Sequence, residues 1–267
     1  MSPERSENTL GDAPAGLQPS HTSGSKVEPT GQAAWHLEMP AGPRGKYRLA
    51  QLDNYGSLPR RLFPHRPPFR LSLQARASAE VIPGTWGFGL WNNPFGMAIL
   101  RGVELLRLPA LPNAAWFFFA SPPNYLSLRD DLPAQGWLAA TFRSPRWRPL
   151  VLALGAPALP LLAWATAARQ LRRLGRRIVR QDAARLSLDP RDWHRYEMEW
   201  QPAKVRFWVD GELALETSAA PHGPLGLVIW VDNQYARLGP DGHVRFGTLA
   251  NPEPAWIEIR GLEVIRD

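Results

Sequence analysis

Residues 193–217 predict three consecutive antiparallel strands, and this run constrains the fold more than any other part of the chain. Its first portion alternates aromatic or apolar side chains with charged ones, which is typical of a strand with one buried face. Pro202 interrupts the alternation as a turn does, and a second alternating run follows it. Asp210-Gly211 then predicts a two-residue hairpin, because a type I′ turn needs positive φ at both central residues.

Composition limits the class of the protein. The 267 residues are 44% hydrophobic and include 12 tryptophans, ample for one large all-β domain or two small ones, and one sandwich with insertions is the simplest account. The chain has no cysteine, and its six histidines lack the spacing of zinc ligands, so we expect no metal and no cofactor. Much of the net charge of +7 falls between residues 143 and 180, which makes it a local feature and not a nucleic-acid footprint.

Further alternating runs predict strands along most of the chain. Turn signals recur about every 8–12 residues, and at least ten short strands result, the pattern of an all-β two-sheet jelly-roll sandwich. Outside 193–217 the predicted strands are 35–39, 47–53, 69–78, 85–91, 116–120, 125–129, 137–143, 225–231 and 256–265.

The two ends of the chain differ in composition. Residues 1–34 are rich in Ser, Pro, Gly and Thr and predict a disordered leader; no apolar run typical of a signal peptide follows the first Met. The sandwich domain is expected at 35–267, interrupted by an insertion at 149–188. The expected location is cytoplasmic or membrane-peripheral by default.

The insertion changes from strand period to helix period. Residues 151–168 carry no charge, although glycine and proline interrupt them, and a basic amphipathic helix is predicted next. Two interpretations are open: the apolar stripe of Leu171, Leu174 and Ile178 caps the sandwich, or the helix lies on an anionic membrane surface. The predicted membrane-contact residues are Arg169, Arg172, Arg173, Arg176, Arg177 and Arg180.

Several motifs, taken in order, carry a family resemblance. FRLSLQARAS, Pro-Gly-Thr-Trp at 83–86, WHRYEMEW, FWVDGEL and the closing WIEIRGLEVI follow one another. This order resembles the concanavalin A-like lectin/glucanase superfamily and, within it, the laminarinase-type glycoside hydrolases of family 16. The resemblance covers residues 35–267 without the insertion and implies a jelly-roll fold. The residues that match the family's strand-pair pattern are His194, Tyr196, Trp200, Phe207, Asp210 and Gly211.

The resemblance implies a catalytic strand written Glu-x-Asp-x-[x]-Glu, which this chain lacks. Retaining hydrolysis needs two carboxyl groups about 5–5.5 Å apart, and alternate residues of a strand share a face. Between residues 81 and 129 the single carboxylate is Glu104, and the counterpart strand is the apolar run 115–120. Glu197 and Glu199 share the charged face of another strand, which favours a solvated surface pair. The sequence therefore predicts no catalytic residues.

A sugar-binding surface is predicted instead. Gly87 and Gly89 leave one face of a strand bare, where a ligand or another backbone can come close. Two polar-aromatic clusters, Trp-Asn-Asn and Trp-Val-Asp-Asn-Gln-Tyr, offer rings to stack on pyranoses and amides to bridge hydroxyls. The candidate carbohydrate-binding residues are Trp86, Trp91, Asn92, Asn93, Tyr125, Trp230, Asp232, Asn233, Gln234 and Tyr235.

These observations predict a non-catalytic carbohydrate-binding or envelope-associated protein. Its partner is a polysaccharide or other glycan, with an anionic membrane surface as a further partner. A divergent glycoside hydrolase with relocated carboxylates is the alternative. Nucleic acid is disfavoured, because the basic helix carries no interleaved aromatic residues for stacking bases.

Overall fold

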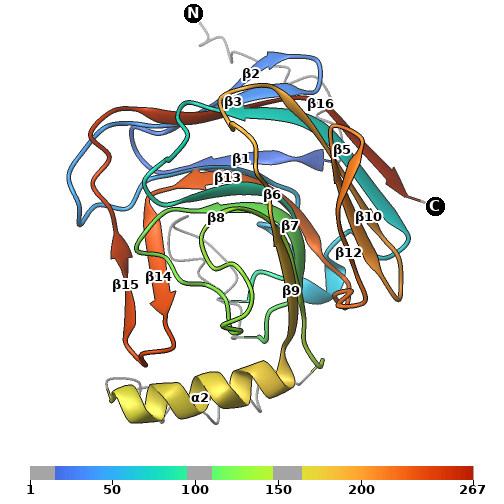
Figure 1. The fold of residues 1–267 in the computed structure, drawn as a ribbon. Helices are drawn as coiled ribbons and strands as arrows, with labels where there is room; N and C mark the ends of the chain where they lie inside the picture. The colour runs from blue at the N-terminus through green and yellow to red at the C-terminus, as the bar shows by residue number, and fades with distance from the viewer. Residues whose placement is uncertain (1–15, 95–109, 147–163, 267) are drawn as a thin grey trace, which may run out of the picture.

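Two seven-stranded antiparallel sheets pack face to face in the computed structural model, which describes residues 16–94, 110–146 and 164–266 (Figure 1). We call them sheet 1 and sheet 2. Sheet 1 curves, and its concave face turns away from sheet 2 and toward the helix and a separate two-stranded ribbon (Figure 1). The predicted all-β two-sheet sandwich is confirmed.

Strands that are distant in sequence lie side by side in both sheets. In spatial order, sheet 1 contains β1 (Gln18–His21), β4 (Leu49–Asp53), β13 (Gly226–Asp232), β6 (Thr85–Trp91), β7 (Ala114–Ala120), β8 (Gly136–Arg143) and β9 (Arg180–Arg185). Sheet 2 contains β12 (Glu212–Thr217), β11 (Val205–Val209), β10 (His194–Trp200), β5 (Phe69–Ala77), β16 (Ala255–Arg266), β3 (Ala34–Met39) and β2 (Lys26–Gly31). The remaining elements are the ribbon of β14 (Gln234–Leu238) and β15 (Val244–Thr248), a short 3-10 turn at Arg60–Leu62 and the helix α2 (Ala165–Ile178).

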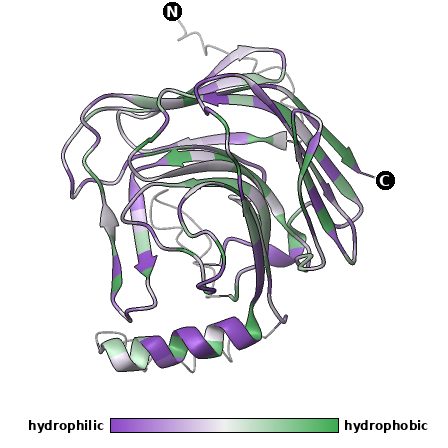
Figure 2. Cartoon of the chain, viewed as in Figure 1, coloured by the Kyte–Doolittle hydropathy of each residue, from purple (hydrophilic) through white to green (hydrophobic). Residues whose placement is uncertain are grey.

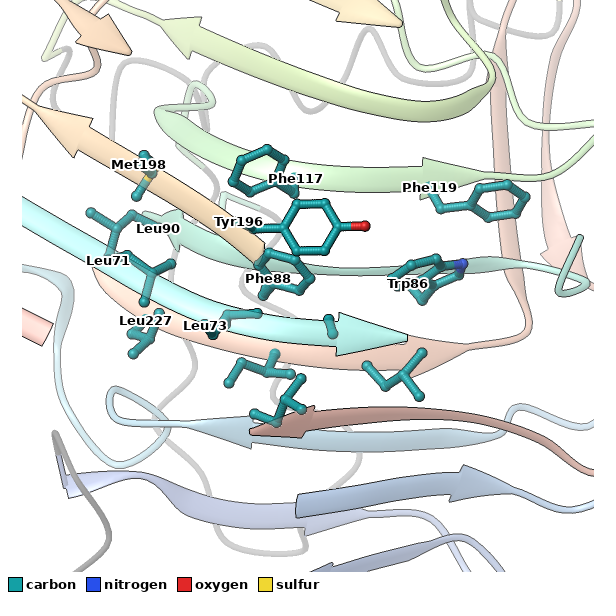
Figure 3. Packing of buried hydrophobic residues seen from close by; sticks show 14 of the residues in the cluster. Leu71, Leu73, Trp86, Phe88, Leu90, Phe117, Phe119, Tyr196, Met198 and Leu227 are labelled. Carbon is teal, nitrogen blue, oxygen red and sulfur yellow. The ribbon is translucent and has the colours of Figure 1, made fainter. Parts of the chain in front are cut away.

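The core between the sheets follows the period of two that the sequence shows. Tyr196 and Met198 of β10 project from sheet 2 toward Phe88 of β6 and Phe117 of β7, which project from sheet 1 (Figure 3). The Phe207 ring of β11 also crosses to sheet 1, 5.2 Å from the Phe117 ring. Asp210 has φ of +50° and Gly211 of +85°, as the predicted type I′ hairpin requires.

The prediction of a disordered leader is wrong for the part of it that the structure describes. Residues 18–21 form β1 beside β4, and residues 26–31 form β2 beside β3. Both are outermost strands of their sheets, and most side chains of β2 are exposed. An edge strand of this kind is held by backbone hydrogen bonds to one neighbour and needs no apolar alternation, so its sequence carries little strand signal.

The predicted boundaries of the insertion also need correction. Residues 149–163 lie outside the described residues, and α2 ends at Ile178. Residues 180–185, predicted to be helical, form β9 at the edge of sheet 1, where they pair with β8. The run 125–129 forms no strand; Tyr125 makes a single bridge to Arg237 of β14.

Candidate functional site

The concave face of sheet 1 carries every second residue of its strands. Cross-strand pairing places Thr85, Gly87, Gly89 and Trp91 of β6 on this face, beside alternate residues of β7 and β13. On β7 those alternate residues are aromatic or small, at the strand where the family resemblance implies carboxylates. The β7 side chains on the concave face are Ala114, Trp116, Phe118 and Ala120.

The two glycines of β6 make room for neighbouring groups. A Cβ atom on Gly87 would lie 2.2 Å from the carbonyl oxygen of Phe117 and 3.1 Å from a ring carbon of Trp230. A Cβ atom on Gly89 would lie 2.5 Å from the Cα of Trp116. The sequence allowed a ligand or another backbone at this bare face, and the structure places the β7 backbone and a tryptophan ring there.

Four aromatic side chains form a continuous group across the concave face, which we call the tryptophan row: Trp91, Trp116, Phe118 and Trp230. The ring centroids of Trp91 and Trp116 lie 5.7 Å apart, and those of Trp116 and Trp230 lie 5.6 Å apart. Phe118 stacks on Trp116 at 5.4 Å. The row therefore joins the two predicted clusters, one of which begins at Trp91 at the end of β6 and the other at Trp230 of β13, through Trp116 of β7.

The indole N–H groups of this row differ in their partners. Trp230 Nε1 donates to the Thr85 hydroxyl at 3.0 Å, and the Trp230 side chain is only 8% exposed. Trp91 and Trp116 are partly exposed, and within the described part of the chain neither buried Nε1 atom has a hydrogen-bond partner. A buried donor without an acceptor is unfavourable by about 1–3 kcal/mol. Because both Nε1 atoms are buried, a ligand on this face would meet the rings and not these donors.

Two carboxylates occur on the described strands of this face, Asp53 of β4 and Asp232 of β13. Asp53 pairs with Val228, whereas Asp232 pairs with Leu49, so the two acids are offset by four residues along β13. Four residues of strand correspond to about 13 Å, more than the spacing that either glycosidase mechanism uses. This pair therefore cannot act as nucleophile and acid on one glycosidic bond. Glu104 lies outside the described residues.

The Asp232 carboxyl is buried at the ribbon end of the tryptophan row. One oxygen accepts a 2.7 Å hydrogen bond from the Thr85 hydroxyl, and the other accepts from the Tyr47 hydroxyl at 3.4 Å. Removal from water raises the pKa of Asp232 to about 7, because burial disfavours the charged form more than these hydrogen bonds favour it. The carboxyl therefore changes protonation near neutral pH.

The asparagines that follow Trp91 hold the chain together near the end of β6. The Asn92 side chain accepts from the Asn113 backbone and donates to the Leu111 carbonyl oxygen at 2.8 Å. Asn93 has φ of +45°, and its carbonyl oxygen accepts from the Arg60 guanidinium at 2.6 Å. Asn92 is therefore occupied by internal hydrogen bonds.

Two residues of the predicted sugar site are corrected by their burial. Trp86 is fully buried in the core between the sheets, with its ring 4.0 Å from that of Trp137, so it cannot stack on a sugar. Asn233 is also fully buried, and its amide donates to the carbonyl oxygens of Lys46 and Leu249. Both side chains hold the protein together.

The remaining three candidates lie away from the tryptophan row. Gln234 and Tyr235 belong to β14 of the ribbon and are partly exposed. The Tyr125 ring lies close to two guanidinium groups, 5.5 Å from that of Arg172 and 5.8 Å from that of Arg237. Of the predicted set, the structure places the Trp91 and Trp230 rings in the tryptophan row and the Asp232 carboxyl next to it.

Two arginines of the predicted membrane-contact set are placed differently by the structure. Arg172 is 4% exposed and donates to the carbonyl oxygens of Ser127 and Leu238 at 2.9 and 3.1 Å. Arg180 lies in β9 and not in the helix. The other four, Arg169, Arg173, Arg176 and Arg177, are exposed on α2. Among the described residues, no helix is long and apolar enough to cross a membrane.

No group of three potential metal ligands is close enough to hold an ion within the described ranges. Trp116 and Phe118 are the site residues that sequence reasoning missed. A signal for them existed, since alternate positions of the run 116–120 face the glycine side of β6 once the two strands are paired.

No protein-family model and no curated protein sequence matches this chain. Among solved structures, a Bacillus licheniformis β-glucanase aligns with a TM-score of 0.46 and 12% identity over 95% of this chain and 94% of its own. A legume lectin-like domain from Entamoeba histolytica gives 0.42 and 9% over 94% and 90%. A sialidase gives 0.44 and 8% over 94% of this chain but only 17% of the sialidase. Sequence identities this low assign no residue a role.

Proposed function

We propose that this protein binds carbohydrate without cleaving it, and that the glycan lies on the tryptophan row at Trp91 and Trp116. One observation carries the proposal. These two partly exposed rings lie 5.7 Å apart on the concave face of sheet 1.

A sugar matches this arrangement, because a pyranose has an apolar face that packs on an aromatic ring. Trp230 supports Trp116 from the side, and its own N–H is already used by Thr85. A site with one aromatic surface and few convergent polar groups is typical of small-ligand recognition.

The test is glycan binding by the full-length protein and by single variants. Wild-type protein is screened against a broad polysaccharide panel by affinity electrophoresis, and Kd is then measured for the best ligand. Trp91→Ala and Trp116→Ala should each weaken binding about ten-fold, which corresponds to about 1.4 kcal/mol. Trp116→Phe should lose less, because it keeps an aromatic ring at this position.

Trp208→Ala is the matched control, since Trp208 is a partly exposed tryptophan of β11 in sheet 2. It should bind like wild type. Equal loss in the control and in the Trp91 and Trp116 variants would place the site elsewhere, and a wild-type protein that retains no glycan would reject the proposed function.

The divergent-hydrolase alternative has one observation in its favour. The Asp232 carboxyl, with its pKa raised to about 7 by burial, has the proton affinity of a general acid. It has no second carboxylate at the required spacing on the described strands of the concave face. We expect no release of reducing sugar from β-1,3 or mixed-linkage glucans. Turnover that disappears in Asp232→Asn would favour the alternative.

Association with the cell envelope is a separate part of the proposal. It does not follow from the tryptophan row and depends on the surface of α2.

A further inference from the structure

Helix α2 docks on the sandwich through a face that contains a buried arginine. The helix residues Ala168 and Arg172, together with Val179 just beyond its end, are buried. The Arg172 guanidinium lies 2.8 Å from the Asp130 carboxylate and also donates to the carbonyl oxygens of Ser127 and Leu238. This network fixes the rotation of the helix about its axis.

That rotation leaves the largest apolar side chains of the segment in solvent. Trp164, at the N-terminal cap, is 68% exposed, Leu171 is 46% exposed and Leu174 is 51% exposed. At 100° per residue these three fall within an arc of about 80°, so they form one stripe. The capping interpretation is therefore wrong for Leu171 and Leu174.

The stripe lies beside a strongly basic surface. Arg169, Arg173, Arg176 and Arg177 are exposed, and the 14 residues of α2 include no Asp or Glu. On the helical wheel Arg177 lies about 60° beyond Leu174, on the side of the stripe away from the sandwich, and Arg173 lies about 40° further on. Figure 2 shows the hydrophilic residues gathered toward the C-terminal part of α2, where the arginines lie. Among the described residues, Asp130 forms ion pairs with Arg172 and, at 3.9 Å, with Arg176.

We propose that α2 binds an anionic lipid bilayer in the plane of the interface. Trp164, Leu171 and Leu174 enter the headgroup region, and Arg173 and Arg177 contact the lipid anions. An exposed apolar stripe next to a cationic face is the pattern of helices that lie on membranes, and a tryptophan is favoured at the boundary of the hydrocarbon. This inference is independent of the glycan site, since it uses another surface of the molecule.

Insertion can be measured directly, because the chain contains no cysteine and any introduced thiol is unique. Full-length Leu174→Cys is labelled with nitrobenzoxadiazole and mixed with vesicles of 30% phosphatidylserine in phosphatidylcholine, or of phosphatidylcholine alone. With the anionic vesicles the emission should increase and shift to the blue. Leu213→Cys is the control, since Leu213 is 56% exposed on β12 of sheet 2, and its label should not respond.

Co-sedimentation separates the two contributions to binding. Arg173→Gln/Arg177→Gln should weaken binding to the anionic vesicles about 30-fold, from about 1 kcal/mol per arginine. Leu171→Gln/Leu174→Gln should abolish the pelleting that remains in high salt, because only the apolar part survives screening. Arg70→Gln/Arg195→Gln, two exposed arginines of sheet 2, removes the same charge and should change binding by less than about two-fold.

Three results would overturn the proposal. Wild-type protein that pellets with neither vesicle has no membrane surface here. If Leu171→Gln/Leu174→Gln pellets like wild type and the emission of the label at residue 174 does not change, the protein is adsorbed by charge without insertion. Arginine-dependent binding to a DNA duplex without vesicle binding makes the helix a phosphate-binding surface for nucleic acid. Circular dichroism of each variant confirms that the loss is not due to unfolding.

Discussion

The Thr85 hydroxyl donates a 2.7 Å hydrogen bond to the buried Asp232 carboxyl. The Thr85 hydroxyl oxygen also accepts a hydrogen bond from Trp230 Nε1 at 3.0 Å. The Tyr47 hydroxyl donates to the second oxygen of the Asp232 carboxyl at 3.4 Å. Since an indole N–H can only donate and an ionised carboxyl can only accept, the hydrogen bonds run from Trp230 through Thr85 to Asp232 when Asp232 is ionised. The tryptophan row is thereby tied to the segment that leads into β4.

The first prediction is that Asp232 makes the stability depend on pH. Its pKa rises from 3.8 in the unfolded chain to about 7 in the folded protein, so between these values the folded state holds more protons than the unfolded state. The contribution of Asp232 to the free energy of unfolding is therefore fully present below pH 4 and is lost as the pH rises to 7. The loss is on the order of 4 kcal/mol.

Asp232→Asn removes this titration and keeps an oxygen that accepts from Thr85. The variant should gain stability relative to wild type as pH rises from 4 to 7, and the difference should level off above pH 7. Urea midpoints of both proteins at pH 4, 5.5, 7 and 8 measure it. A difference independent of pH would show that Asp232 is ionised throughout.

The second prediction concerns the inter-sheet core. Phe207 is fully buried and meets Phe117 of the opposite sheet, so Phe207→Ala should destabilise the protein by about 3–5 kcal/mol. Phe246 of β15 is 79% exposed and provides the matched control, with an effect of less than about 0.5 kcal/mol. Denaturant unfolding compares the two, and equal midpoints would mean that the faces of β11 are reversed.

The third prediction is that Arg172 fixes α2 to the sandwich. Arg172→Gln deprives the Ser127 and Leu238 carbonyl oxygens of their donor and should reduce stability by about 1–3 kcal/mol. Arg173→Gln, on the exposed face, should have almost no effect. In a double-mutant cycle with Asp130→Asn, the coupling energy should stay below about 1 kcal/mol, because Asp130 is 51% exposed. A larger coupling would make the ion pair, and not the carbonyl contacts, the main anchor.

The fourth prediction tests the close approach at β6. Gly87→Ala places a methyl group 2.2 Å from the Phe117 carbonyl oxygen, so the backbone of β6 or β7 must move, at about 1–3 kcal/mol. At Gly31 the added methyl group would meet only the Ala34 Cβ at 3.8 Å, and Gly31→Ala should be neutral or slightly stabilising. Thermal unfolding of the pair checks the contrast. A tolerated Gly87→Ala would mean that the β7 backbone does not approach β6 this closely.

Local pattern determined the elements whose two faces differ. In β10 and β11 the alternation identified the strands, and it correctly assigned Trp200 and Phe207 to the core, because a period of two places every second side chain on the buried face. It did not decide which face of β6 held Trp86. Paired residues of neighbouring strands lie on the same face of a sheet. Trp86 pairs with Val231 on the core face, and Trp230 pairs with Gly87 on the concave face. Both strands are buried on both sides, so their sequences show no alternation that reveals this choice.

Tertiary contacts alone decided the rest. β1, β2 and β9 lie at sheet edges, where backbone pairing with one neighbouring strand forms the strand whatever its side chains. The α2 sequence defined an apolar arc and a basic arc, but not which of its residues would face the protein. That depended on two carbonyl oxygens 45 and 66 residues away from Arg172, which accept its guanidinium in the interior. A buried guanidinium must be paired with hydrogen-bond acceptors, whereas Leu171 and Leu174 can remain in contact with water. The pairing of Arg172, and not the burial of the leucines, therefore determines which face of α2 contacts the protein.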